Sequence, residues 1–244
     1  MNENSRGEQF LRERMRKPAH NITHCMRCGT CCMKGGPVLH HEDKKILRSG
    51  RVGYEHLITI RKGEPAYNPI HGKLERVIRD IIKVAGKGED WACYFYDEKD
   101  AACSIYGQHF LECRLLKCWD TAEIIRVIGR GTLCRADIIN QDDPILHVIE
   151  EHERECPADE LENLIAAASA GSDKKKTFAR LGELVAKDVS MRAYAISELG
   201  LKAEYELFIF GHPLSKLLAN RGLAVLAPEG NSIRSTRPSS RKTI

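Results

Sequence analysis

Four cysteines lie within eight residues near the start of the chain, where residues 25–32 read CMRCGTCC. Thiolates bind Zn²⁺ and the iron of iron–sulfur clusters, and a Cys-x-x-Cys step lets one turn of backbone deliver two sulfurs to one centre. The segment makes this step twice, which is typical of metal sites and not of a chance grouping of thiols. The sequence therefore predicts a bound metal.

Four further cysteines extend this pattern downstream, and we predict that all eight are ligands: Cys25, Cys28, Cys31, Cys32, Cys93, Cys103, Cys113 and Cys118. The expected cofactor is Zn²⁺ or Fe, the latter including a [4Fe–4S] cluster. Neighbouring side chains of extended backbone point to opposite sides, so Cys31 and Cys32 can serve different centres. The eight thiols allow two four-sulfur sites that share a wall, one [4Fe–4S] cluster with spare cysteines, or one metal with a reactive thiol.

Such sites need positive charge nearby, because Zn²⁺ bound by four thiolates carries a net negative charge. The sequence neighbours of the ligands include four candidate cations that can donate hydrogen bonds to sulfur: Arg27, Lys34, Arg114 and Lys117.

The remaining thiols and imidazoles fit the pattern less well. Cys134 and Cys156 are expected to be small buried residues, since free cysteine is among the most buried residue types. His152 and Cys156 share a helix face, but two ligands are too few for a metal site. His24, beside the first cysteine, is a reserve ligand.

The composition predicts a soluble cytoplasmic protein with an ordinary core, since 42% of residues are hydrophobic and no apolar run is long enough for a membrane span. In a reducing compartment, closely spaced cysteines indicate metal or redox chemistry more often than disulfides. Residues 1–17 carry a net charge of +2 and residues 231–244 a net +4, so the rest of this +4 chain carries about −2. A nucleic-acid partner is therefore not expected.

The cysteines divide the chain into two parts between flexible ends. Residues 1–20 and 229–244 lack periodic apolar positions and predict flexible tails, the second of them basic. Residues 21–120 predict a small cysteine-rich α+β domain stapled by metal. Residues 121–228 predict a mainly α-helical region. The expected fold class is α+β.

Short strands are expected in the cysteine-rich part. After a short helix over residues 41–48, strands are predicted at 57–61 and 66–70, and residues 74–84 favour a strand that ends at Val84.

A β-hairpin is predicted where residues 91–96 and 101–106 flank the polar turn DEKD. Pairing about residue 98 would set Cys93 and Cys103 opposite or nearly opposite, where facing Cβ atoms are roughly 5 Å apart. Two sulfurs would then reach one ion.

Helices are predicted in the second part at 121–128, 142–155, 157–168, 172–200 and 213–221. Asp120 and Glu123 form a possible capping box for the first, and Ser172 a cap for the longest. One apolar stripe of the longest helix is expected to face the core: Phe178, Leu181, Val185, Val189, Ala193 and Ile196.

Several motifs resemble the YkgJ-type cysteine-cluster family, a zinc- or iron-chelating domain that also forms part of the flagellin lysine N-methylases. They are CMRCGTCC at 25–32, WAC at 91–93, CSIY at 103–106 and ECR at 112–114, within about residues 21–120. The resemblance implies that the matched cysteines bind metal or an iron–sulfur cluster. The chain departs from the family where His109-Phe110 replaces the usual Arg-Pro.

The leading functional interpretation is a cytoplasmic metal-binding protein, with a protein partner or protein substrate as a further expectation. The resemblance suggests an alternative, protein lysine N-methyl transfer, but no Gly-x-Gly-x-x-Gly loop and no Cys-x₃-Cys-x₂-Cys motif is present. Electron transfer is a third reading, although the ferredoxin spacing is excluded because the fourth cysteine follows the third directly. No catalytic acid, base or nucleophile stands out from the sequence.

Overall fold

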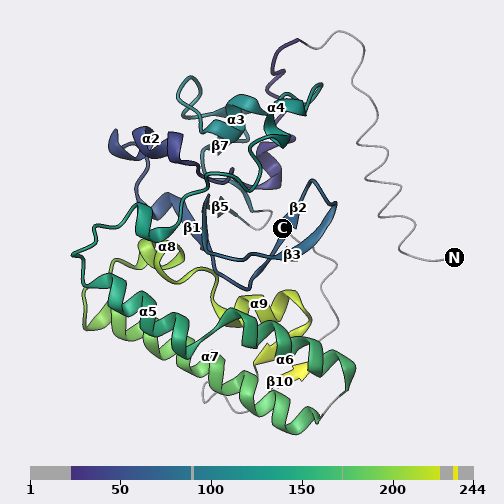
Figure 1. The fold of residues 1–244 in the computed structure, drawn as a ribbon, viewed down its shortest axis with the longest axis vertical. Coiled ribbons are helices and arrows are strands. Elements are labelled where there is room, and N and C mark those ends of the chain that lie inside the picture. The colour runs from purple at the N-terminus through teal and green to yellow at the C-terminus, as the bar shows by residue number, and fades with distance from the viewer. Residues whose placement is uncertain (1–22, 89–90, 172, 226–232, 236–244) are drawn as a thin grey trace, which may run out of the picture.

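The chain folds into short strand pairs and short helices at one end, and long packed helices with the last strand pair beside them at the other (Figure 1). The computed structural model describes residues 23–88, 91–171, 173–225 and 233–235. This mixed arrangement confirms the predicted α+β class. None of the helices within these ranges is long and apolar enough to cross a membrane.

Every strand of the described ranges belongs to a two-stranded antiparallel pair: β1 (Leu57–Ile60) with β4 (Ile81–Val84), β2 (Pro65–Asn68) with β3 (Lys73–Arg76), β5 (Gly86–Lys87) with β6 (Ala92–Cys93), β7 (Tyr96–Asp97) with β8 (Ala102–Cys103), and β9 (Leu223–Val225) with β10 (Ile233–Ser235). The predicted tail 229–244 is described only at β10. The predicted tail 1–20 lies outside the described residues.

The single strand predicted over residues 74–84 is wrong at its start, because the segment forms two strands with different partners. β3 pairs with β2, whereas β4 pairs with β1 and ends at Val84 as predicted. Between them Val77 forms backbone hydrogen bonds with Gly63 and Glu64, and the Asp80 carboxylate accepts a hydrogen bond from Arg135 Nε at 3.0 Å. These contacts lie between β3 and β4, where the predicted single strand is interrupted.

The helices and 3-10 turns of the described ranges are η1 (Cys32–Lys34), η2 (His41–Asp43), α2 (Lys44–Arg48), η3 (Tyr54–His56), α3 (Leu111–Leu115), α4 (Ala122–Ile125), η4 (Arg135–Asp137), α5 (Ile145–Glu155), α6 (Ala158–Ala170), α7 (Lys174–Ser197), η5 (Ala203–Tyr205), α8 (Glu206–Phe210) and α9 (Leu214–Asn220). Helices α5, α6, α7 and α9 form where the sequence predicts them. The proposed cap Ser172 lies outside the described residues, and the Asp173 side chain accepts from Lys176 N at the start of α7 instead.

The helix predicted after Asp120 forms but is shorter than expected, since α4 ends at Ile125 and not at residue 128. Asp120 Oδ1 does accept a hydrogen bond from Ala122 N at 3.0 Å, in the manner of a cap. Glu123 does not complete the capping box, because its carboxylate pairs with Lys117 Nζ at 2.6 Å. The apolar residues that follow cannot continue a helix past the glycines at 129 and 131, both of which have positive φ.

The chain returns late in the sequence to cover its first strands. Helix α8 packs on β1, and the Thr59 hydroxyl donates to the carbonyl oxygen of Phe208. The Phe208 ring is fully buried and stacks on Tyr54 with ring centroids 4.3 Å apart. A second apolar core lies among α6, α7 and α9 and includes Leu161, Leu181, Leu184, Leu214 and Leu218.

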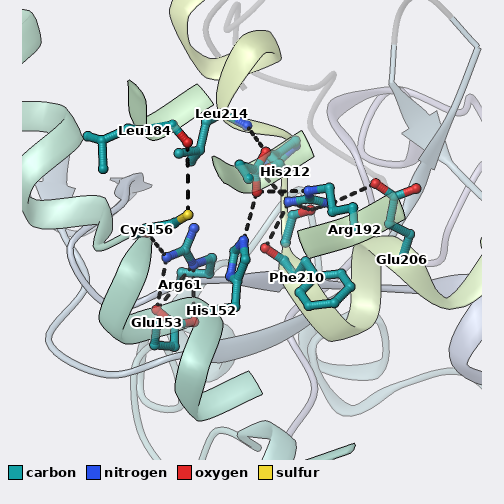
Figure 2. Close-up of polar contacts among 12 residues, drawn as sticks. Arg61, His152, Glu153, Cys156, Leu184, Arg192, Glu206, Phe210, His212 and Leu214 are labelled. Atoms are coloured by element: carbon teal, nitrogen blue, oxygen red, sulfur yellow. Dashed lines mark hydrogen bonds and ion pairs between the residues drawn. The ribbon is translucent and has the colours of Figure 1, made fainter. Parts of the chain in front are cut away.

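Between these two cores lies a buried polar junction centred on Asp188 of α7, which is 0% exposed. Its Oδ1 accepts hydrogen bonds from His152 Nε2 at 2.7 Å and Arg192 Nε at 2.8 Å, and its Oδ2 accepts from Leu214 N at 2.9 Å. Arg192 also donates to Glu206 and to three backbone carbonyls at the end of α8 (Figure 2). The junction therefore clamps α8 and α9 onto α7.

Arg61, at the end of β1, extends the junction toward the strands (Figure 2). Its guanidinium is 0% exposed and donates to the Glu153 carboxylate and to the carbonyl oxygen of Cys156. Arg135 Nη2 donates to the same carboxylate at 2.7 Å. A buried charge is retained only when it is paired and hydrogen-bonded, so these contacts hold β1 and η4 to the end of α5.

Because His152 is buried in this junction, we expect the folded protein to become less stable on mild acidification. Burial lowers the pKa of His152 from its usual 6.5, and the hydrogen bond to Asp188 opposes this only in part. The unfolded chain therefore binds the proton more readily than the folded one, so the unfolding free energy should decrease as the pH falls below about 6.5. Denaturant titrations between pH 8 and pH 5 should show this slope in the wild type and a shallower one in His152→Gln. Equal slopes would contradict the prediction.

Candidate metal centre

The eight clustered cysteines come together from four segments at the end of the molecule away from α7. Cys25, Cys28, Cys31 and Cys32 belong to the first described segment, which Figure 1 shows in purple near α3 and α4. Cys93 ends β6, Cys103 ends β8, Cys113 lies in α3 and Cys118 follows it. η1, which begins at Cys32, packs against β6.

The loop that carries the first four cysteines is tightly wound. Arg27 and Gly29 have φ angles of 54° and 72°, and a Cβ on Gly29 would lie 1.9 Å from the hydroxyl oxygen of Tyr96. Glycine is therefore required there. Arg27 N donates to Cys25 Sγ at 3.4 Å, which is the amide-to-sulfur contact expected of a Cys-x-x-Cys turn.

The register predicted for the hairpin of residues 91–96 and 101–106 is wrong. Cys103 pairs with Tyr96 across β7 and β8, whereas Cys93 pairs with Gly86 across β5 and β6. The first run of the predicted hairpin is divided between two strand pairs because Trp91, with a φ of 56°, begins a separate pairing with residues 86–87. Cys93 and Cys103 are brought near each other by two adjacent hairpins and not by one ladder.

Helix α3, and with it Cys113, is positioned by two carboxylates. Asp43, 0% exposed, accepts from Leu111 N at 2.8 Å and so anchors the start of the helix. Glu112 accepts from Val38 N at 2.8 Å through one oxygen, and its other oxygen lies 3.3 Å from His40 Nε2. The residues that follow the first cysteine loop therefore fix α3 beside it. Sequence reasoning missed this network, because Asp43 stands in no recognisable motif and Glu112 enters the motif at 112–114 only as the neighbour of Cys113.

Four of the five exposed thiols form what we call the outer set, comprising Cys25, Cys28, Cys31 and Cys118. Burial raises the pKa of the Cys118 thiol, and the charges of the other three raise it further. A hydrogen bond with Thr30 lowers the pKa of Cys28. The three thiols of the first loop therefore lie within electrostatic reach of Cys118.

The remaining thiols form an inner set, comprising Cys32, Cys93, Cys103 and Cys113. Cys93 is buried, and Cys32 and Cys103 are half-buried. Burial of the sulfur raises the pKa of the Cys113 thiol, and the charges of Cys93 and Cys103 raise it further. The residue as a whole is nevertheless exposed. Burial likewise raises the pKa values of Cys93 and Cys103.

Cys31 and Cys32 link the two sets, with their sulfurs 4.0 Å apart. The contact with the Cys32 thiol lowers the pKa of Cys31 to about 6, which favours the thiolate form of Cys31. The same contact, followed by burial, raises the pKa of Cys32. The adjacent cysteines therefore face different surroundings, as expected if they serve different centres.

The donor set fits a thiolate-bound metal by its chemistry and its convergence. Among the described residues, no three His, Cys, Asp or Glu side chains already stand in a geometry that holds a metal ion. Binding must therefore draw the sulfurs inward. The outer set can move with its exposed loop, and the inner set is held by short strands and α3.

The predicted cations are mostly engaged elsewhere. Arg27 lies over the Tyr106 ring at 4.6 Å, Arg114 donates to the carbonyl oxygen of His109, and Lys117 pairs with Glu123. Lys34 does help to lower the pKa of Cys31, although as a minor contribution after the contact with the Cys32 thiol. Lys83, which sequence reasoning did not single out, is a charged neighbour of Cys93.

The other thiols behave as the sequence predicts or stand apart from the centre. Cys156 is 0% exposed, and burial raises its pKa to about 12, so it is a buried neutral thiol. Cys134 is half-buried and not buried as predicted, and its thiol donates to Asp137 at 3.1 Å. Phe110, which replaces the proline usual in the resembling family, is 1% exposed and packs in the core.

No curated protein and no solved structure matches this chain. One family model does, the CxxCxxCC family, whose description reads "Putative zinc- or iron-chelating domain". Its match begins at the residue before Cys25 and takes in all eight clustered cysteines. Residues 24–135 therefore match the model of the CxxCxxCC domain, and this similarity supports zinc or iron binding by this part of the chain.

Proposed function

We propose that the protein binds two metal centres, one in the outer set and one in the inner set of thiols, with zinc or iron as the metal. The observation that supports the proposal is the electrostatic influence of thiols from different segments on one another: Cys25, Cys28 and Cys31 act on Cys118, and Cys93 and Cys103 act on Cys113. Cys31 also acts on Cys103 and Cys113, so the two sets lie side by side. Four thiolates satisfy a tetrahedral Zn²⁺ and also the four irons of a [4Fe–4S] cluster. Cys31 belongs to the outer set and Cys32 to the inner one.

The metal-binding part extends beyond residue 120 in this proposal. Leu133 is buried in the core beneath β4, and its backbone forms hydrogen bonds with Leu39 and Ile82. The region from about residue 21 to residue 135 would thus fold around the metals, and the binding free energy of the metals would add to its folding free energy.

The proposed compartment is the cytoplasm. All ten cysteines lie within the described residues and are free thiols. Thiolate ligands persist where glutathione and thioredoxin keep thiols reduced.

Metal analysis of protein purified without oxygen tests the proposal. We expect either two zinc ions per chain in a colourless protein, or iron with an equal amount of acid-labile sulfide and a broad visible absorption band. Bleaching of that band by dithionite would identify a redox-active cluster, since zinc has no redox chemistry. A single zinc ion per chain would overturn the division into two sets, and a metal-free protein that takes up neither metal on reconstitution would overturn metal binding itself.

A further inference from the structure

The side chain of Lys83 reaches from β4 toward the inner set. The loop after the first cysteines is bound to this strand, since Val84 N donates to Pro37 O and Leu39 N donates to Ile82 O, both at 2.9 Å. A Cβ on Gly36 would lie 2.4 Å from Val84 Cβ, so glycine is what allows the close approach. Lys83 is therefore held at a fixed place beside the loop.

The position of its ammonium group can be located from Gly35, which ends η1. A Cβ built on Gly35 would lie 3.3 Å from Lys83 Nζ and 3.6 Å from the carbonyl oxygen of Trp91. Gly35 is three residues after Cys32, and Trp91 is two residues before Cys93. The ammonium thus lies between the two segments that supply these inner-set sulfurs.

The side chain of Lys83 has no hydrogen bond or ion pair with another described residue, although it is only partly exposed. The opposite charges that act on its ammonium group are Glu112 and the thiolate form of Cys93. Both oxygens of Glu112 are already used by Val38 N and His40. A partly buried ammonium without a direct partner destabilises the folded state. The thiolates of the inner set are therefore the groups with which the Lys83 ammonium can pair.

We propose that Lys83 is the fixed cation of the inner set, and that it donates a hydrogen bond to the Cys93 sulfur and offsets thiolate charge when the set holds metal. The inference rests on the proposed function. Lys83 acts on a ligand and not on the metal, so it is a positioning residue. Groups that orient or neutralise ligands typically change metal affinity about 10- to 100-fold when removed.

The test compares zinc dissociation constants of the full-length protein, measured by chelator competition, in the wild type and three variants. Lys83→Met keeps the length of the side chain and removes its charge, so we expect zinc at the inner set to bind about 10- to 100-fold more weakly. Lys83→Arg keeps the charge and should recover most of the affinity. Lys62→Met is the matched control, because Lys62 is exposed and lies outside the segments that carry the thiols.

Two readouts separate this role from simple packing. The unfolding free energy of metal-free Lys83→Met should equal or exceed that of the wild type, because methionine removes a partly buried charge. Equal weakening by methionine and arginine, or unchanged zinc affinity in Lys83→Met, would overturn the inference while leaving the proposed function intact. A wild-type protein that binds no metal would reject both.

Discussion

Replacing Cys113 with serine is expected to remove one of the two metal ions per chain and to leave the other bound. Cys113 supplies the inner set from α3, whose start is anchored by the hydrogen bond from Leu111 N to Asp43. A site occupied at 100 times its dissociation constant adds about 2.7 kcal/mol to the unfolding free energy. Loss of the inner metal should therefore lower the unfolding free energy of the holoprotein by at least about this amount.

Metal content and denaturant unfolding, measured on the same samples, check the expectation. Cys28→Ser should remove the outer metal with a smaller loss of stability, because its loop is exposed and contributes no buried core residue. Cys134→Ser is the matched control, since Cys134 lies outside both sets, and it should keep both metals. If Cys113→Ser retained both ions, the assignment of Cys113 to the inner set would be wrong.

The cysteine pattern predicts the metal chemistry because ligand type and spacing are local properties of the sequence. The family match supports zinc or iron chelation over the same residues. The way the sulfurs are brought together depends on long-range contacts that spacing does not encode. Gly86, not Cys103, pairs with Cys93, and the groups that position α3 and approach the inner set are Asp43, Glu112 and Lys83.

The long helices are predicted well because their apolar periodicity and their starts are strong local signals. The stripe predicted on α7 is correct at Leu181 and Val185, which are buried. It is wrong at Val189, which is 52% exposed, and at Ala193, which is exposed as well. In this half of the helix the core-facing positions belong to Asp188 and Arg192 instead. An analysis of hydrophobic periodicity assigns charged residues to the surface and cannot anticipate a buried ion pair.

That buried pair leads to the largest stability effect expected in the helical part. Asp188→Asn keeps the shape of the side chain and removes the charge that balances Arg192, which is only 5% exposed. Breaking a buried charge pair by neutralising one partner typically costs about 3–5 kcal/mol, because the other charge stays buried without compensation. We expect a loss of this size in the unfolding free energy. The exposed Asp142, changed to asparagine, is the matched control and should change it by less than about 0.5 kcal/mol.

The pH dependence of the same variant gives an independent check. Burial raises the pKa of Asp188, but the hydrogen bond from His152 and the charge of Arg192 outweigh it, so the pKa lies below the usual 3.8. A carboxylate with a lowered folded-state pKa contributes stability above its unfolded pKa, and this contribution is lost as the pH falls through the folded value. The difference between wild type and Asp188→Asn should therefore be full at neutral pH and shrink below about pH 4.

Metal content separates this effect from that of the cysteines. None of the eight clustered thiols touches the Asp188 junction, whose partners are His152, Arg192 and Leu214. Folded Asp188→Asn should thus bind as much metal per chain as the wild type while unfolding at lower denaturant. A variant that lost metal together with stability would show that the junction is required to assemble the thiol sets. A variant as stable as the wild type at neutral pH would show that Arg192 finds its compensation in Glu206 and the carbonyls at the end of α8 alone.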